Sequence, residues 1–423
     1  MHPALSAALA LTPFLAPAQE VDSGEELAER LAAWLEPLDR AGYLSGTVLV
    51  ALGDEVVFER AYGSAHVELD VPMGVGTRLG IASITKPITT ALALRLLEEG
   101  SLELDATLAE FVPGFENGER ITVEHLINHR AGIPHRVTEP QEETRPWSTV
   151  EVAARAAQAA PLCAPGERSI YSSAGFTVLA HVLERAAGAP YDELIARHVL
   201  GPAGMEHTAA ADSRAVLPGR AASYVDTGRG VVNAPLQDLS FLTGAGSLYS
   251  TPRDLFRLAR AIRSGRLGET VRANLAPSGT VSWNGATSGF RAFLDVSSGG
   301  EVTVAVCSNR VTGALDVLRR GLPRIARGET VDPAELPDFE PLEVDQEYLA
   351  AFVGDFSPRP GSTMRVRAGE GFLYVNSWTL VPTGPDEFHS PQDWACVEPD
   401  YDDEGRVTAL RWGSMTMRRL ADG

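Results

Sequence analysis

The chain contains a single lysine, Lys86, and otherwise takes its positive charge from arginine. Arginine stays protonated at any pH that a protein tolerates, whereas a buried lysine can lose its proton near neutral pH. The one retained amine therefore indicates a site that uses a neutral base. The formal net charge of −20 argues against nucleic acid or an anionic membrane surface as a partner.

Cysteine is also scarce, with only Cys163, Cys307 and Cys396. Their odd number and wide spacing predict neither a disulfide framework nor a metal site. We expect buried thiols, with one bridge as the alternative. No later apolar stretch reaches the length of about 18 residues that a membrane span needs. We therefore expect no transmembrane segment, no metal and no cofactor.

Residues 1–18 have the pattern of a signal peptide. Ala4 to Leu15 are mostly apolar, and Ala16-Pro17-Ala18 forms a small-x-small cleavage site. The segment ahead of the apolar run lacks Lys and Arg, which departs from the usual pattern. The segment predicts export, to a secreted or periplasmic location.

The rest of the chain divides into a larger α+β domain at 22–328, a linker at 329–341 and a small all-β domain at 342–423. Strand patterns at 46–54 and 56–63, and again at 280–283, 290–296 and 301–308, enclose a helical middle. We expect one sheet built from both ends of this domain. The linker is rich in proline and acidic residues. After it, seven short strand-like segments separated by turns predict a barrel-like domain.

Ser83 lies three residues before Lys86, at the start of a helical run at 88–99. Residues i and i+3 share a helix face, so the hydroxyl and the amine can approach hydrogen-bond distance. The positive end of the helix dipole further disfavours the ammonium form. Taken alone, the same pattern also suits a helix cap followed by a solvated lysine.

Two later motifs complete a constellation with Ser83-x-x-Lys86: Tyr171-Ser172-Ser173 precedes a helix, and Trp283-Asn284-Gly285-Ala286 ends a strand. Their order and spacing resemble the serine β-lactamase and penicillin-binding-protein superfamily, in its class C β-lactamase-like branch. The resemblance covers roughly residues 25–325. Further matching segments are 125–134 (HLINHRAGIP), 165–171 (PGERSIY), 200–205 (LGPAGM), 244–255 (GAGSLYSTPRDL) and 287–290 (TSGF).

The resemblance implies an antiparallel sheet with helices on both sides, an all-helical part and an appended small β domain. It implies that Ser83 is the nucleophile and that Lys86 takes its proton, directly or through Tyr171. Tyr171 would pass the proton to the leaving group, and a hydrogen bond from Lys86 would favour the phenolate or poise the phenol for transfer. The backbone N–H groups of Ser83 and Ala286 would form the oxyanion hole.

Two residues depart from the family pattern. Ser173 stands where an asparagine usually binds the substrate's amide, and Trp283 stands where Lys or His usually meets the substrate's carboxylate. With Asn284 and Gly285, they are the expected substrate-binding residues. Both changes weaken recognition of acyl-D-Ala-D-Ala or a β-lactam, and they resemble the esterases of this branch. Arg291 could restore a positive charge, although a surface strand position is the alternative.

The sequence thus predicts an exported serine hydrolase that acts on a small-molecule or peptide substrate, with esterase-like specificity. A DD-carboxypeptidase or class C-type β-lactamase, and an inactive binding protein with this fold, remain as alternatives. His125 and His129 have a spacing that suits zinc on a helix, but the glutamate of metalloproteases is missing. The segment 400–405 begins like a calcium loop but favours an acidic hairpin turn. The oligomeric state is left open.

Overall fold

The computed structural model describes residues 24–211, 214–228, 230–358, 363–369, 371–376 and 378–420. The predicted signal peptide at 1–18 lies outside these residues. Within the described ranges, no helix combines the length and apolar character needed to cross a membrane.

A five-stranded antiparallel sheet forms the centre of the first domain, in the order β10-β11-β12-β1-β2. Its two N-terminal strands lie beside three strands from the other end of the domain, which confirms the arrangement expected from the sequence. β10 lies at an edge of the sheet. The strands are β1 (Gly46–Leu52), β2 (Glu55–Tyr62), β10 (Val281–Ala286), β11 (Arg291–Val296) and β12 (Val302–Ser308).

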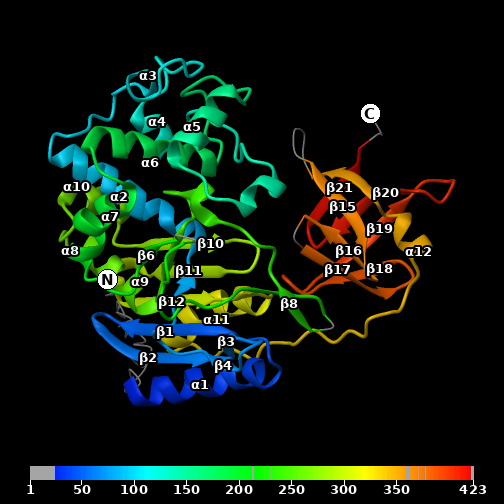
Figure 1. Ribbon diagram of the computed structural model, residues 1–423. Helices are drawn as coiled ribbons and strands as arrows, with labels where there is room; N and C mark the ends of the chain where they lie inside the picture. The colour runs from blue at the N-terminus through cyan, green and yellow to red at the C-terminus, as the bar shows by residue number, and fades with distance from the viewer. Residues whose placement is uncertain are drawn as a thin grey trace, which may run out of the picture.

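Both faces of this sheet are covered by helices (Figure 1). Val48 and Val50 point to one face and pack with α1 (Gly24–Arg40) and α11 (Ala314–Ala326). Leu49 and Ala51 belong to the larger core on the opposite face. A strand buried on both faces reads as a continuous apolar run, which is why this segment of β1 shows no alternation of apolar and polar residues.

The remaining helices and short strands lie mainly between β2 and β10 in sequence. The helices are α2 (Thr85–Glu98), α3 (Leu108–Phe111), α4 (Val123–Ile127), α5 (Thr149–Gln158), α6 (Ser173–Ala187), α7 (Tyr191–Ile195), α8 (Gly201–Ala203), α9 (Pro252–Arg263) and α10 (Glu269–Leu275). The short strands are β3 (Ser64–His66), β4 (Val71–Pro72), β5 (Leu79–Gly80), β6 (Ala209–Ala210), β7 (Tyr224–Asp226), β8 (Val231–Asn233), β9 (Leu248–Ser250) and β13 (Arg310–Val311).

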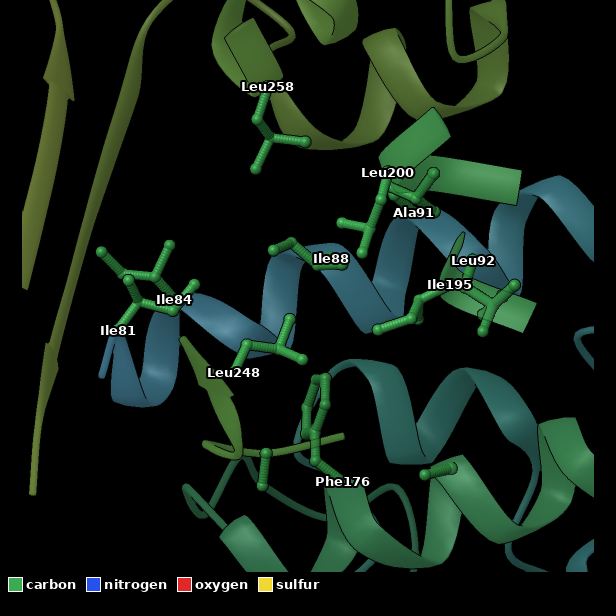
Figure 2. Close-up of a cluster of buried hydrophobic side chains, with 14 of the residues drawn as sticks. Ile81, Ile84, Ile88, Ala91, Leu92, Phe176, Ile195, Leu200, Leu248 and Leu258 are labelled. Carbon is green, nitrogen blue, oxygen red and sulfur yellow. The ribbon is translucent and has the colours of Figure 1, made fainter. Parts of the chain in front are cut away.

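Helix α2 is buried around most of its circumference, which fixes the position of its N-terminus. Figure 2 shows Ile84 and Ile88 in one cluster of buried side chains with Leu248 from β9 and Phe176 from α6. A helix that is apolar on all sides belongs in the interior of a large core. The residues at the start of α2 are therefore held by packing from several directions.

The C-terminal domain is a closed barrel of eight antiparallel strands that follows the short helix α12 (Gln346–Ala350). Seven strands were expected; the missed eighth strand pairs with both β14 and β20 and closes the barrel. Only Met417 of that strand is fully buried, so its apolar signal is weak. The strands are β14 (Gly354–Ser357), β15 (Met364–Gly369), β16 (Phe372–Val375), β17 (Trp378–Gly384), β18 (Glu387–Ser390), β19 (Ala395–Tyr401), β20 (Val407–Trp412) and β21 (Met415–Arg419).

The segment between α11 and α12 has neither helix nor strand but is attached to the first domain. The Trp34 indole N–H donates to the carbonyl oxygen of Asp332 over 2.9 Å, and Arg30 donates to that of Glu329 over 3.0 Å. The first residues of the region predicted as a linker therefore lie against α1. In the acidic segment 400–405, residues 400 and 401 end β19 and residues 402–405 form the hairpin turn toward β20, in which Asp402 accepts from the backbone N–H of Glu404 and Arg406.

The three cysteines differ in their surroundings. Cys307 is fully buried on β12, whereas Cys163 is partly exposed and Cys396 is exposed. The expectation of buried thiols was therefore wrong for two of the three. Cys396 lies on a barrel strand whose side chains alternate between interior and surface, which its sequence neighbours do not reveal.

Asn309 joins three segments of the first domain, and its replacement should destabilise the fold. Its fully buried carboxamide donates to the carbonyl oxygens of Ser64 and Ala222 and accepts from the Ser45 hydroxyl. Asn309→Ala removes all three hydrogen bonds from a fully buried position and should lower the free energy of unfolding by about 3 kcal/mol. Urea denaturation measures the change. Asn274→Ala is the control, because Asn274 is exposed on α10 and should change stability by less than about 0.5 kcal/mol. Equal effects of the two substitutions would contradict this account.

Candidate active site

Ser83 lies in a tight 3-10 turn (Ala82–Ile84) directly before α2, which begins at Thr85. The preceding residue, Ala82, has a φ of 46°, in the left-handed region that non-glycine residues rarely adopt. Such strain persists only where the surrounding structure enforces it, and it gathers at functional sites. The turn and the buried helix together fix the position of the Ser83 side chain.

The structure brings together the three residues expected to act in catalysis. The Lys86 amine lies 3.2 Å from the Ser83 hydroxyl oxygen, one helical turn away. The Tyr171 hydroxyl donates to the same oxygen over 2.8 Å, although the two residues lie 88 positions apart in the sequence. Ser83 is therefore in hydrogen-bond contact with two groups that can move protons.

Burial gives Lys86 the properties of a base. The residue is only 5% exposed, and this loss of solvation lowers its pKa to about 7. Its amine also contacts the carbonyl oxygen of Ala245 at 2.9 Å and the Ser173 hydroxyl oxygen at 3.2 Å. A neutral amine has two N–H donors and one lone pair. If the donors serve Ala245 and Ser173, the lone pair is left to accept the proton of Ser83.

Tyr171 meets the other two residues in a different way from the one expected. The Lys86 amine lies over the face of the Tyr171 ring, 4.8 Å from its centroid, rather than beside the hydroxyl. Burial raises the pKa of Tyr171, although its hydrogen bond to Ser83 acts in the opposite direction. The expected stabilisation of a phenolate by Lys86 is therefore not the arrangement found. Tyr171 is a protonated phenol at neutral pH.

Ser173 is the first residue of α6 and contacts Lys86. Its hydroxyl accepts from Lys86, and the residue is only 5% exposed although it lines the cleft. An asparagine here would extend further into the cleft, whereas the short serine side chain remains beside the amine. The sequence marked this position as a departure in substrate binding; the geometry adds a role in orienting Lys86.

These groups open onto a cleft of about 510 Å³. Trp283, Asn284, Gly285 and Ala286 on the edge strand β10 form one wall, as the motif predicted. An unpaired strand edge can also bind an extended substrate through its backbone. The lining residues are Ala82, Ser83, Lys86, Pro87, His129, His135, Arg136, Tyr171, Ser173, Gln237, Leu242, Ala245, Gly246 and residues 282–287.

The backbone of β10 approaches Ser83 closely at Gly285. A Cβ atom on Gly285 would lie 2.7 Å from the Ser83 backbone nitrogen and closer still to the Ile81 carbonyl oxygen. The N–H of Thr287 donates toward β11, to the Phe290 carbonyl oxygen. Because successive N–H groups of a strand alternate in direction, the N–H of Ala286 faces the cleft, on the same side as Ser83. This is the arrangement that an oxyanion hole requires.

The cleft residues that were not predicted as site residues include four with nitrogen-bearing side chains: His129, His135, Arg136 and Gln237. Burial is the main cause that lowers the pKa of both histidines to about 4, so each is neutral at pH 7. The rings of His129 and His135 lie 4.6 and 5.5 Å from the Tyr171 ring. His135 follows the matched segment 125–134 directly, which is the only signal that could have found it.

The pair His125 and His129 does not share a helix face, because α4 ends at Ile127. The Nδ1 atom of His125 accepts from the backbone N–H of Thr122, and that of His129 accepts from Ser172. Each histidine therefore satisfies a backbone group of a different segment. The spacing that suggested zinc reflects two separate structural roles.

A buried carboxylate holds two of the missed residues in place behind the cleft. Glu143 is 1% exposed and accepts from Arg136, from Thr138 and from the amide of Gln237. Arg136 and Gln237 come from loops that are distant in sequence. Their joint position depends on this network, which no local pattern in the chain reports.

The chain matches the family model described as Beta-lactamase over residues 26–299. Penicillin-binding protein 4* of Bacillus subtilis (strain 168) is 25% identical over 401 residues, which cover 82% of this chain and 87% of that protein. Esterase EstB of Burkholderia gladioli is 34% identical over 198 residues, or 42% of this chain and 50% of the esterase. The crystal structure of SurE superposes with a TM-score of 0.62 at 22% identity, over 93% of this chain and 99% of SurE.

Proposed function

The chain belongs to the β-lactamase family, and from this premise we propose that it is an exported serine hydrolase that cleaves small esters through an acyl-enzyme on Ser83. The observation that carries the proposal is the buried Lys86 amine, with its pKa near 7, in contact with the Ser83 hydroxyl. A neutral amine beside a serine hydroxyl is the activated nucleophile that acyl transfer requires.

In the acylation step, Ser83 Oγ attacks the ester carbonyl while its proton passes to Lys86. The carbonyl oxygen becomes an oxyanion, and the backbone N–H groups of Ser83 and Ala286 stabilise it. Tyr171, which is hydrogen-bonded to Ser83 and protonated, donates its proton to the departing alkoxide. Protonated Lys86 then restores the proton of Tyr171 through a water molecule in the cleft, because the amine lies over the Tyr171 ring and not beside its hydroxyl. The alcohol leaves, and Ser83 carries the acyl group.

In the deacylation step, a water molecule attacks the acyl carbonyl. A base must take one proton of this water, and Lys86 and Tyr171 are the groups closest to Ser83 that titrate. The tetrahedral intermediate uses the same two N–H donors. Its collapse returns a proton to Ser83 Oγ and releases the carboxylic acid.

Two residues of the cleft support the proposed ester specificity. Trp283 is neutral and bulky at the position where the family pattern usually has Lys or His, and the Ser173 hydroxyl already accepts from Lys86. Neither residue offers the charge or the carboxamide that would hold the carboxylate and amide of an acyl-D-Ala-D-Ala peptide. Breaking an ester needs neither contact, because attack and proton transfer depend on Ser83, Lys86 and Tyr171.

A substrate panel tests this function. Purified protein and its Ser83→Ala variant are incubated with a chromogenic short-chain ester, a chromogenic cephalosporin and an acyl-D-Ala-D-Ala peptide. Turnover of the ester, abolished in the variant, together with a mass increase of one acyl group on the intact protein, is the expected result. Higher kcat/KM for the cephalosporin or peptide would favour the DD-carboxypeptidase or β-lactamase alternative. Absence of both turnover and adduct would favour a binding protein.

The pH dependence of ester hydrolysis should report on Lys86. Because the free amine is the active form, kcat/KM should rise with pH through a midpoint near 7 and level off above it. The cleft histidines have pKa values near 4 and are already neutral over this range, so their titration cannot produce the rise in kcat/KM near pH 7. The measurement is kcat/KM from pH 5 to 9 with a neutral ester. A flat or falling profile would refute the role of Lys86, and His135→Gln should keep the midpoint.

Export is proposed on the sequence of residues 1–18 alone. Expression of the full chain with its N-terminal segment, followed by N-terminal sequencing of the mature protein, tests it. Cleavage after Ala18 is the expected result. An intact N-terminus on protein that stays inside the cell would contradict it.

A further inference from the structure

A second pocket of about 90 Å³ adjoins the catalytic cleft and contains residues of both domains. It shares Ala286 and Thr287 with the cleft, so it begins at the proposed oxyanion hole. Its other walls are Ser288, Arg291, Val311, and Trp378 and Gln392 of the barrel. A substrate that extends along β10 past Ala286 enters this pocket.

The barrel residues of this pocket are held against the first domain by buried contacts. Gln392 is 1% exposed; its amide donates to the carbonyl oxygen of Asp226 over 2.8 Å and accepts from the backbone N–H of Thr379. Trp394 packs edge-on against Tyr43, with ring centroids 5.0 Å apart, and directly over Gly313. Figure 1 shows the barrel beside β8 of the first domain. Trp378 is therefore a fixed wall.

Arg291 gives the pocket an incompletely satisfied cation. One terminal nitrogen donates to Asp316 over 3.1 Å, while the other, Nη1, is buried and has no hydrogen-bond partner among the described residues. A buried donor without an acceptor is costly, and a charged one more so. Within the part of the chain that the structure describes, no aspartate or glutamate lines either the pocket or the cleft. Arg291 itself lines the pocket and its side chain is 24% exposed, so a ligand carboxylate that enters the pocket can reach the guanidinium.

We propose that this pocket is a specificity subsite for a short carboxylate-bearing end of the substrate, with Arg291 as its cation and Trp378 of the barrel as its apolar wall. The inference rests on the proposed function and deepens it. This cation lies on the neighbouring strand, on the other side of Ala286 from Trp283, so it would meet a different part of the substrate from the one that a cation at position 283 would meet. The C-terminal barrel is then part of the substrate-binding site. The carboxylate belongs either to the acyl group or to the leaving group, and substrates can distinguish the two.

Two pairs of chromogenic esters test the proposal by turnover. The first pair is 4-nitrophenyl hydrogen glutarate and 4-nitrophenyl pentanoate, which differ by a carboxylate on the acyl group. The second pair is 3-carboxy-4-nitrophenyl butyrate and 4-nitrophenyl butyrate, which differ by a carboxylate on the leaving group. We expect kcat/KM to favour the carboxylate by about tenfold in one pair, mainly through KM. A preference in neither pair overturns the proposal.

Charge variants assign that preference to Arg291. In the pair of esters that shows the preference, Arg291→Gln should bring the ratio of kcat/KM for the carboxylate-bearing ester to kcat/KM for the uncharged ester close to one. Asp316→Asn removes the competing carboxylate from Arg291 and should raise the ratio. The matched control is Arg365→Gln, which breaks an exposed arginine–aspartate pair on the barrel, outside both pockets, and should leave the ratio unchanged. A ratio that survives Arg291→Gln would overturn the assignment.

A binding measurement separates this proposal from the hydrolase proposal. In the Ser83→Ala background, glutarate is titrated by calorimetry into protein that keeps Arg291 and into protein that also carries Arg291→Gln. Binding that weakens at least tenfold with Arg291→Gln supports the subsite even if no ester is turned over. Trp378→Ala, checked for folding by its thermal unfolding, should weaken glutarate and admit longer acyl chains. Equal glutarate binding with and without Arg291 would refute the subsite.

Discussion

Lys86→Arg should lower the rate of Ser83 acylation by about 10³-fold or more, although the substitution keeps the charge of the side chain. The native amine is buried and has a pKa of about 7, so a large fraction is neutral at pH 7. A guanidinium does not lose its proton in this range and has no lone pair to accept from Ser83. The burst of nitrophenol in a stopped-flow assay measures the acylation rate directly.

Lys86→Met and Lys86→Ala separate loss of the base from a steric effect. Methionine has a similar length without a nitrogen, and it should lose as much activity as arginine. Lys86→Ala leaves space for a small primary amine, so ethylamine should restore part of the activity, in proportion to its free-base concentration. Near-normal acylation by Lys86→Arg, or no difference between the arginine variant and the wild type in pH profile, would refute a base at this position.

Gly285→Ala should reduce kcat by about 10²- to 10³-fold with an intact fold, because it displaces one donor of the oxyanion hole. The added Cβ would lie 2.7 Å from the Ser83 backbone nitrogen, and its other close neighbour is the Ile81 carbonyl oxygen. Both are backbone atoms in a tightly packed turn, so β10 must move outward. That movement withdraws the N–H of Ala286 from the position where the oxyanion develops.

Gly76→Ala is the matched control for this substitution, because a Cβ at Gly76 meets no heavy atom of the described residues within 4 Å. We expect it to leave kcat and the unfolding temperature unchanged. In Gly285→Ala, the effect should appear in kcat for every ester, because the oxyanion is common to all of them. A loss confined to KM, or to one substrate, would indicate that Gly285 contacts substrate and does not set the spacing of the hole.

Much of the fold could be predicted from the sequence, because its elements leave strong local patterns. The apolar run of β1 and its hairpin partner, and the three strands before α11, are periodic enough to place one sheet made from both ends of the domain. A barrel-like domain was expected, but with seven strands instead of the eight that the structure shows. Met415–Arg419 presents a single buried side chain, and its place is decided by pairing with β14 and β20.

The sequence indicated most of the residues proposed for catalysis, but the structure revised the contacts between them. Ser83, Lys86 and Tyr171 meet as their order along the chain suggested, yet Lys86 contacts the ring of Tyr171 and not its hydroxyl. His135 and Gln237 were not foreseen. They reach the cleft from loops whose course depends on the buried Glu143 and on packing against α6, and neighbouring residues in sequence do not encode that course.

The sequence by itself determined which chemical groups are available: one lysine, a serine three residues before it, and a glycine where two backbones meet. It also determined the sheet, because strand and helix periodicity arises from residues a few positions apart. The tertiary structure alone decided that burial lowers the pKa of the lysine to about 7, since this burial depends on segments as distant as Ala245 and Ser173. It alone placed Trp378 of the barrel beside Ala286. The burial of a residue and its neighbours in space depend on how the whole chain packs. A short stretch of sequence therefore does not determine them.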